Sequence, residues 1–218
     1  MKRLLATVLM SGVLLACQAP LPLSSAKTAA IRSHNLASKA LAEGDVPAAE
    51  AGFREAMRQA AALDDWAGEA ESRLAWAVSL QRRGQGAEAE RALAPLLDDL
   101  RLPYPLAIQQ QALAWRAQWQ LAARNWPAVE QDLLRLSSLC TDECRPRALL
   151  ASLQAQLALH EKRLADAAGY AEQALALAGT EASETRAYAL RVQANIALLD
   201  NPEQGIAPIM AALDIDRQ

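Results

Sequence analysis

One spacing of small and apolar residues recurs along the chain and constrains its fold more than any other feature. The segment AEGDVPAAEAGFREAM, residues 42–57, places Ala49, Phe53 and Ala56 at positions i, i+4 and i+7, which lie on one side of an α-helix. The same spacing returns in Ala89, Leu93 and Leu96; Val129, Leu133 and Leu136; Ala167, Ala171 and Ala174; and Gly205, Ile209 and Ala212. The first members of successive triplets are 40, 40, 38 and 38 residues apart. A period this regular predicts a repeat architecture.

A short break in the helical pattern precedes each triplet. The breaks are Gly44-Asp45, Gly84-Gln85, Arg124-Asn125, Lys162-Arg163 and Asp200-Asn201. Gly, Asn and Asp tolerate the left-handed conformation that ends a helix, and a proline such as Pro47 can open the next helix without losing a needed N–H. Further helical stretches precede the breaks, at about residues 27–43, 67–83, 105–123, 146–161 and 182–199. Because no stretch alternates like an amphipathic strand, we expect five helix–turn–helix units and no sheet.

The segment LAEGDVPAAEAGFREAM resembles the tetratricopeptide repeat (TPR), in which a Gly-Asp turn is followed by a small residue, an aromatic residue and Ala. In this chain those positions are Ala49, Phe53 and Ala56. GQGAEAERALAPL and NWPAVEQDLLRL look like weaker copies, and the resemblance covers about residues 30–213. It implies an all-α fold, a right-handed superhelical array of about five TPR-like repeats (an α-solenoid), with a repeat domain at residues 30–218.

The chain departs from this family in two respects. The usual period is about 34 residues, whereas this chain repeats every 38 to 40. In units three and four, the first helix carries its large residues one position early, as with Trp115 and Trp119, and Leu153 and Leu157. The phase of those helices is therefore open, and other helical-hairpin arrays with a period near 40 remain alternatives.

Alanine at core positions is explained by close packing. Where helices stack, a small residue lets one backbone approach another, and a larger residue opposite fills the space. A single hairpin cannot bury its apolar face alone, so it needs its neighbours. Alanine is also the best helix former.

We expect the first residues to form a lipoprotein signal peptide at residues 1–16. Lys2 and Arg3 precede an apolar run from residue 4 to residue 15, which is the layout of a secretory leader and is too short for a bilayer span of roughly 20 residues. The tetrapeptide Leu-Leu-Ala-Cys at residues 14–17 resembles the bacterial lipobox, which implies that Cys17 is acylated, with palmitate or a similar chain. Leu15 departs from the lipobox pattern, which usually has Ala or Ser at this position. The alternative is an ordinary leader cut near Ala19, with Cys17 discarded.

This anchor predicts where the protein resides. Several acyl chains would hold the mature chain on a membrane without spanning it, and residues 17–29 would form the lipidated N-terminus and tether. Gln18 stands where Asp would resemble an inner-membrane retention signal, so we expect the outer membrane, facing the periplasm. The formal net charge of −3 argues against nucleic acid as a partner.

Two cysteines, Cys140 and Cys144, remain after Cys17 is assigned. Export places them where oxidation is possible. Three residues lie between them, whereas a redox motif is normally Cys-x-x-Cys, and zinc would need further ligands while His34 and His160 are isolated. We expect a structural disulfide, with free thiols and metal or redox chemistry as alternatives. Since the chain also lacks known catalytic and phosphate-binding motifs, we expect no enzyme activity, no cofactor and no metal.

Five tryptophans against one phenylalanine is an unusual balance. Core packing explains most of them, and one or two exposed tryptophans could anchor a partner, because this residue is enriched in binding hot spots.

TPR arrays bind peptides or partner proteins along the concave surface lined by the first helix of each unit. The resemblance implies that this surface contains residues of units one and two: His34, Ser38, Leu41, Glu71, Leu74 and Val78. We therefore expect an outer-membrane-anchored scaffold or assembly accessory of the bacterial envelope. Pilotin-like or secretin-assembly, outer-membrane-assembly and peptidoglycan-enzyme adaptor roles are not separable. The alternatives are a periplasmic enzyme or thiol-redox module using Cys140 and Cys144, and a carrier of an apolar ligand.

Overall fold

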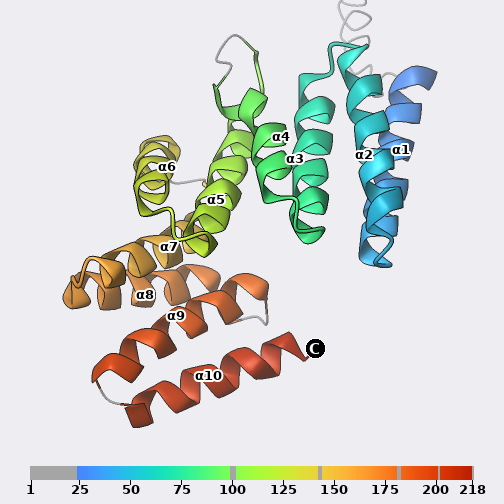
Figure 1. Ribbon diagram of the computed structural model, residues 1–218. Coiled ribbons are helices and arrows are strands. Elements are labelled where there is room, and N and C mark those ends of the chain that lie inside the picture. The colour runs from blue at the N-terminus through green and yellow to red at the C-terminus, as the bar shows by residue number, and fades with distance from the viewer. Residues whose placement is uncertain (1–23, 99–101, 142–143, 181–182, 201, 218) are drawn as a thin grey trace, which may run out of the picture.

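The computed structural model describes residues 24–98, 102–141, 144–180, 183–200 and 202–217. Within these ranges the chain forms ten α-helices and no strand (Figure 1). The helices are α1 (Ser25–Ala42), α2 (Val46–Ala61), α3 (Trp66–Arg82), α4 (Gly86–Asp98), α5 (Leu106–Ala122), α6 (Trp126–Leu139), α7 (Arg147–His160), α8 (Leu164–Ala178), α9 (Glu184–Asp200) and α10 (Pro202–Asp216). The predicted all-α array of five helical hairpins is confirmed.

The repeated triplets lie on the second helix of each hairpin, as predicted. Every member is buried except Ile209, which is half-buried. Each of α2, α4, α6 and α8 packs against both the odd-numbered helix before it and the one after it, whereas α10 packs against α9. The triplets therefore form the shared interior that a stack of hairpins requires.

The turns within the hairpins follow the predicted breaks. Gly44 and Gly84 adopt positive φ angles of 83° and 75°, and Arg124 and Lys162 take the same left-handed region at the corresponding turns. Asp45 then caps α2, because its side chain accepts a hydrogen bond of 3.1 Å from the backbone N–H of Ala48, which satisfies one of the unpaired donors at the helix start. The fifth break includes Asn201, which lies outside the described residues.

The first helix begins earlier than predicted. We expected a helical stretch from about residue 27, and α1 starts two residues earlier, at Ser25; the boundary between tether and repeat domain at residue 30 stays a prediction. The Oγ of Ser24 accepts a hydrogen bond of 3.1 Å from the backbone N–H of Lys27 and caps the helix. Residues 1–23, which include the signal peptide and Cys17, lie outside the described part of the chain.

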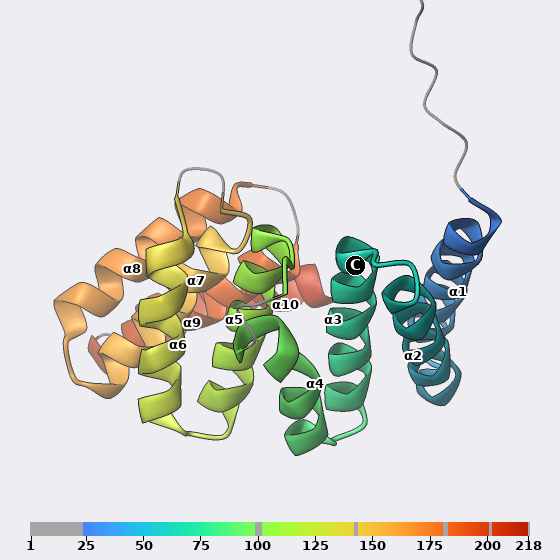
Figure 2. The same cartoon turned by 90° about the horizontal axis from the view of Figure 1, so that it is seen from above.

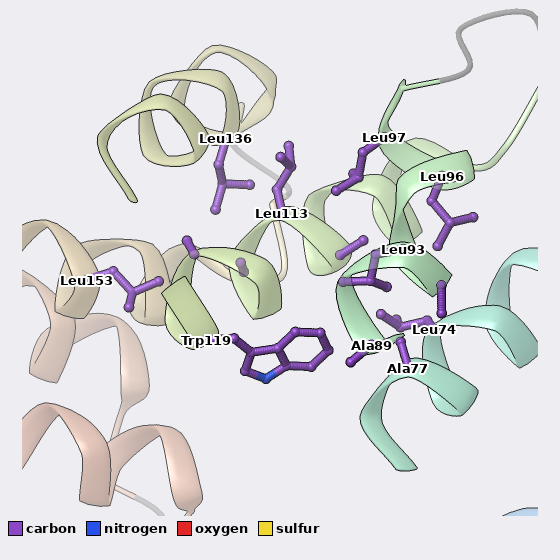
Figure 3. Close-up of a cluster of buried hydrophobic side chains, with 14 of the residues drawn as sticks. Leu74, Ala77, Ala89, Leu93, Leu96, Leu97, Leu113, Trp119, Leu136 and Leu153 are labelled. Atoms are coloured by element: carbon purple, nitrogen blue, oxygen red, sulfur yellow. The ribbon is translucent and has the colours of Figure 1, made fainter. Parts of the chain in front are cut away.

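The largest buried cluster runs through the middle of the array. Leu93, Leu113, Leu136 and Leu153, each from a different helix between α4 and α7, are all fully buried, and Trp119 joins them (Figure 3). Because these side chains come from successive hairpins, the interior is continuous from one repeat to the next. None of the described helices is long and apolar enough to cross a membrane.

The array curves toward its odd-numbered helices. Consecutive odd-numbered helices contact one another from α1 to α9, whereas among the described residues no two even-numbered helices do. Figures 1 and 2 show the hairpins following one another along this curved stack. The odd-numbered helices therefore line the inner side, which is where the sequence places its candidate site.

Candidate partner-binding groove

All six predicted binding residues line one groove on the inner side of the array. The groove has a volume of about 500 Å³. Besides His34, Ser38, Leu41, Glu71, Leu74 and Val78, it is lined by Ala42, Phe53, Ala75, Arg82, Ile108, Gln111, Trp115 and Arg145. Helices α1, α3 and α5 therefore supply most of its wall, and the segment before α7 contributes Arg145. Binding at this groove stays a prediction.

His34 is held in a fixed position at one end of the groove. Its Nδ1 lies 3.0 Å from the Oγ of Ser72 on α3, and its ring meets the ring of Phe53 edge-on, at 5.3 Å between centroids. Burial lowers the pKa of His34 below 6.5, while the nearby carboxylate of Glu71 acts in the opposite direction. The imidazole therefore favours its neutral form, and hydrogen bonding links α1 to α3 at this point.

Leu74 and Val78 form the floor of the groove on α3. Leu74 is only 8% exposed and belongs to the central core cluster, whereas Val78 is half-buried against that cluster. Leu74 therefore serves both the core and the groove, so truncating it would damage the fold as well as the surface. The more exposed Ser38 of α1 is the better position for testing the groove.

The structure settles the phase of the third odd-numbered helix. Ile108, Gln111 and Trp115 of α5 face the groove, while Trp119 is 8% exposed and turns into the core. The two indole rings lie 6.1 Å apart in a tilted arrangement. Gln111 lies 40 residues after Glu71, which is one repeat further along the chain. This offset was the sequence signal that could have placed α5 in the groove.

Trp115 also borders a second cavity of about 300 Å³ further along the inner side. There Trp115 and Leu149 of α7 face Tyr188 and Arg191 of α9. The hydroxyl of Tyr188 accepts a hydrogen bond of 2.6 Å from Nε2 of Gln156, and burial raises the Tyr188 pKa to about 12. The inner surface is thus continuous from α1 to α9, with Trp115 between its two hollows.

The other tryptophans lie outside the groove. Trp126 stacks on His160 at 3.8 Å between ring centroids, with the planes 8° apart. Trp66 meets Tyr104 edge-on at 6.0 Å, and Trp76 packs half-buried against the core. The expectation that core packing accounts for most tryptophans is confirmed, because Trp66, Trp76 and Trp115 pack against the central cluster that contains Trp119. Trp126 instead stacks on an exposed histidine, and Trp115 is the one that also lines the groove.

Buried charged groups elsewhere are paired with one another. Asp132 is 3% exposed and accepts two hydrogen bonds from Arg116, at 2.8 and 2.6 Å, so the guanidinium and the carboxylate meet side by side. Despite the opposing effect of burial, hydrogen bonds and charge attraction from Asp132 raise the pKa of Arg116. This pair joins α5 to α6 and has a structural role, because a buried charge is tolerated when its partner is held in good geometry.

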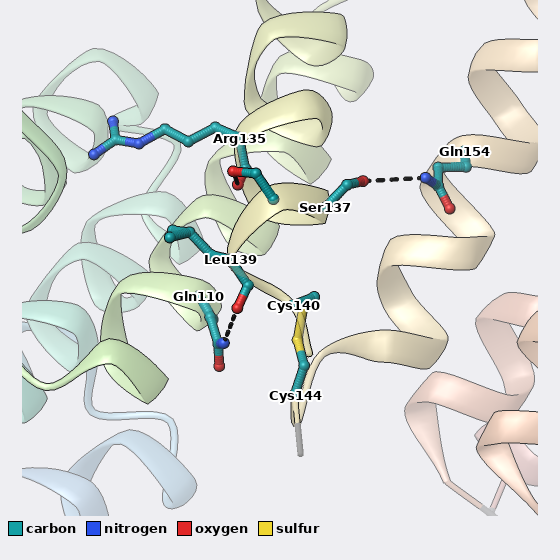
Figure 4. Close-up of a disulfide and its surroundings, with 8 residues drawn as sticks. Gln110, Arg135, Ser137, Leu139, Cys140, Cys144 and Gln154 are labelled. Atoms are coloured by element: carbon teal, nitrogen blue, oxygen red, sulfur yellow. Dashed lines mark hydrogen bonds between the residues drawn. A yellow bond between two sulfur atoms is a disulfide. The ribbon is translucent and has the colours of Figure 1, made fainter. Parts of the chain in front are cut away.

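Cys140 and Cys144 lie side by side in the connection between α6 and α7 (Figure 4). Their Cα atoms are 5.0 Å apart, a separation compatible with a disulfide, and Cys144 is only 5% exposed. The connection is also held by Gln110, whose Nε2 donates a hydrogen bond of 2.8 Å to the backbone carbonyl of Leu139. A structural disulfide stays a prediction. Among the described residues, no group of three or more His, Cys, Asp or Glu side chains could hold a metal ion.

Comparison with solved structures shows the same architecture in TPR proteins. PilF of Pseudomonas aeruginosa superimposes with a TM-score of 0.61 and 19% identity, covering 88% of this chain and 77% of PilF. A Podosopora anserina putative kinesin light chain with TPR-like repeats gives a TM-score of 0.63 and 14% identity, covering 89% of this chain and 97% of that one. A MamA RS-1 double mutant gives a TM-score of 0.57 and 13% identity, covering 90% of this chain and 97% of that one.

No family model matches the sequence, and no curated protein matches it significantly. The structural neighbours establish a TPR-like fold.

Proposed function

We propose that this TPR-like protein is a lipid-anchored scaffold of the bacterial envelope that holds a segment of a partner protein in its inner groove. The observation that carries the proposal is the convergence of side chains from α1, α3 and α5 on one hollow of about 500 Å³. A hollow of this size accommodates a few side chains of an extended or helical segment, and pockets between helices are common binding sites.

The lining indicates what the partner segment contains. Leu41, Val78 and Ile108 offer apolar surface in the groove, and Trp115 is a rigid aromatic residue of the type that dominates binding energy. Arg82 and Arg145 also line it, against the single carboxylate of Glu71. A segment with apolar side chains flanked by an acidic residue complements this surface, since charge complementarity steers association and fixes register.

The anchoring part of the proposal rests on the sequence of the first seventeen residues. Acylation of Cys17 would hold the array close to the outer membrane on its periplasmic side, because the connecting segment spans at most roughly 3.3–3.6 Å per residue. Replacing Cys17 by serine should release the protein from the membrane fraction of a bacterial envelope, and metabolic labelling with a palmitate analogue should be lost with it. Labelling that persists in Cys17→Ser would refute this anchor.

A photoreactive amino acid placed at Ser38 tests the groove directly. In the full-length chain in its bacterial envelope, we expect an adduct with one protein, identified by mass spectrometry. Ser138 of α6 is a matched control, because both serines are exposed and both bond to a backbone carbonyl of their own helix, but Ser138 does not line the groove. Equal adducts from both positions, or none from Ser38, would refute binding in the groove. A lipid adduct from Ser38 would instead support a carrier of an apolar ligand.

The same pair of positions gives a functional readout. Replacing Ser38 by arginine fills part of the groove with a long charged side chain, so we expect capture of the identified partner to be lost. Ser138→Arg should leave capture unchanged. If both variants bind the partner equally well, the partner is held elsewhere on the array.

A further inference from the structure

The last helix presents an apolar stripe to solvent. Ile206, Met210 and Leu213 of α10 are 60%, 48% and 41% exposed, whereas the neighbouring side of the helix is buried against α9 through Ala212. The segment from residue 206 to residue 213, IAPIMAAL, contains no charged or hydrogen-bonding side chain. Helix α10 lies at the end of the array (Figure 1). Terminal repeats of a solenoid normally carry a polar outer face, so the exposed apolar stripe needs an explanation.

Earlier repeats show what the equivalent face does. The positions corresponding to Ile206 include Glu50 and Glu90, and both contact the next odd-numbered helix or its end. Glu50 pairs with Arg83 at the end of α3, at 2.5 Å, and Glu90 accepts a hydrogen bond of 2.6 Å from Nε2 of Gln120 on α5.

The positions corresponding to Leu213 behave in the same way. Leu97 of α4 is 1% exposed within the central core, and Leu175 of α8 packs against buried residues of α9. The following helix therefore covers part of this face in the earlier repeats, whereas the positions corresponding to Met210 include Arg54, Leu134 and Glu172, which are exposed. Among the described residues, α10 packs only against α9, so no other described helix covers its apolar stripe.

The stripe has the spacing of a coiled-coil seam. Glu203, Ile206, Met210, Leu213 and Arg217 follow one another at intervals of three and four residues, which places them on one face in the a and d positions of a heptad. All five are exposed. The three central positions are apolar, and the outer two carry opposite charges.

We propose that α10 pairs with α10 of a second copy of this chain, antiparallel, about a two-fold axis near Met210. Glu203 and Arg217 each lie seven residues from Met210, or roughly 10 Å along the helix. An antiparallel partner therefore places Glu203 of one copy beside Arg217 of the other, twice, at the two ends of an apolar seam. A two-fold interface of this kind is self-complementary and is the commonest symmetry of homo-oligomers.

A membrane surface fits this face less well. Helices that lie in a bilayer interface carry Lys and Arg beside their apolar side, whereas α10 carries Asp214 and Asp216 in its last turn and no basic residue there. Arg217 follows directly after the helix and lies 3.5 Å from Asp214. The proposal does not depend on the groove, which is formed by other helices, so either can fail without the other.

Cysteine cross-linking of the full-length chain tests the arrangement. Met210→Cys places a thiol next to the proposed axis, so mild oxidation in membranes should give a disulfide-linked dimer on non-reducing gels. Leu36→Cys is the control, because Leu36 is 61% exposed on α1 and is remote from α10. A mixed cross-link between Leu36→Cys and Met210→Cys chains, without a Met210→Cys dimer, would show head-to-tail stacking and overturn the proposal. So would an adduct of Met210→Cys with a different protein alone.

A charge exchange identifies the partner as a second copy. In detergent-solubilised full-length protein, sedimentation equilibrium should give twice the monomer mass, and Arg217→Glu should weaken the dimer at least tenfold by placing two carboxylates together. Adding Glu203→Arg to the same chain should restore it, because the swapped charges then meet again across the two-fold axis. Both sites are exposed, and unchanged far-UV circular dichroism would verify folding. A monomer at all concentrations, or a double variant as weak as Arg217→Glu, would overturn the proposal.

Discussion

The close approach of α1 and α2 makes Gly52 a test of the packing argument. A Cβ atom added at Gly52 would lie 2.8 Å from the Cβ of Ala37 and 3.4 Å from its Cα, whereas carbon atoms in contact prefer about 3.5–4.0 Å. Because the obstacle is the neighbouring backbone and a methyl group that cannot rotate away, Gly52→Ala must push the two helices apart by a large part of an ångström.

The expected magnitude is a difference of two terms. Replacing glycine by alanine within a helix stabilises by about 0.5–1 kcal/mol, and overpacking of a tight contact costs about 1–3 kcal/mol. Gly52→Ala should therefore lower the free energy of unfolding by about 1 kcal/mol. Gly169 of α8 is the matched control, because an added Cβ there meets nothing within 4 Å. Gly169→Ala should stabilise by about 0.5–1 kcal/mol.

Urea unfolding followed by far-UV circular dichroism measures both variants, and hydrogen exchange across α1 and α2 locates the loss. The difference between the two variants isolates the packing cost, since the change in chemistry is identical. If Gly52→Ala proves as stabilising as Gly169→Ala, small residues do not set the helix spacing here, and the packing argument is wrong.

Three further predictions concern charge, pH and the cysteine pair. Asp132→Ala should lower the free energy of unfolding by about 3 kcal/mol because it leaves Arg116 without its buried partner. Replacing Asp132 by leucine and Arg116 by methionine in one chain should leave that free energy nearly unchanged; thermal unfolding of the single and the double variant checks this. The lowered pKa of His34 means that the unfolded chain takes up the proton first as the pH falls below 6.5. Stability should therefore decline from that pH downward, and less steeply in His34→Asn; denaturation curves between pH 7 and pH 4 that overlay for both proteins would contradict this. Quantitative labelling should find no accessible thiol at Cys140 or Cys144 before reduction, and Cys140→Ser with Cys144→Ser should cost about 2 kcal/mol or less, because the closed loop is short. A reactive thiol in the unreduced protein would favour the redox alternative.

The repeat units could be predicted because their information is local. The buried triplets and the left-handed turn residues each follow from helical spacing and backbone conformation, as at Ala49, Phe53 and Gly44. The start of α1 was placed two residues late because the N-cap role of Ser24, whose side chain accepts a hydrogen bond from the backbone N–H of Lys27, was not recognised in the sequence.

The groove was only half predictable, because its far wall depends on packing between units. Trp115 and Trp119 are equally large, and their own spacing does not show which one enters the core. Their neighbours two turns earlier decide it: Ala112, seven residues before Trp119, is fully buried, whereas Ile108, seven residues before Trp115, lines the groove. Arg145 enters the groove from the connection before α7, a placement that no local pattern encodes.

The ion pair between Lys27 and Asp65 has a mechanical consequence. Their charged atoms are 3.1 Å apart, and the pair ties the first turn of α1 to the start of α3, next to the end where the chain would join its lipid. A force applied at this end of the chain would act on the Lys27–Asp65 ion pair and the Ser24 cap before any other contact, since each hairpin touches only its neighbours. Tension at this end of the chain would therefore separate α1 from α3 first and open the end of the groove that contains His34.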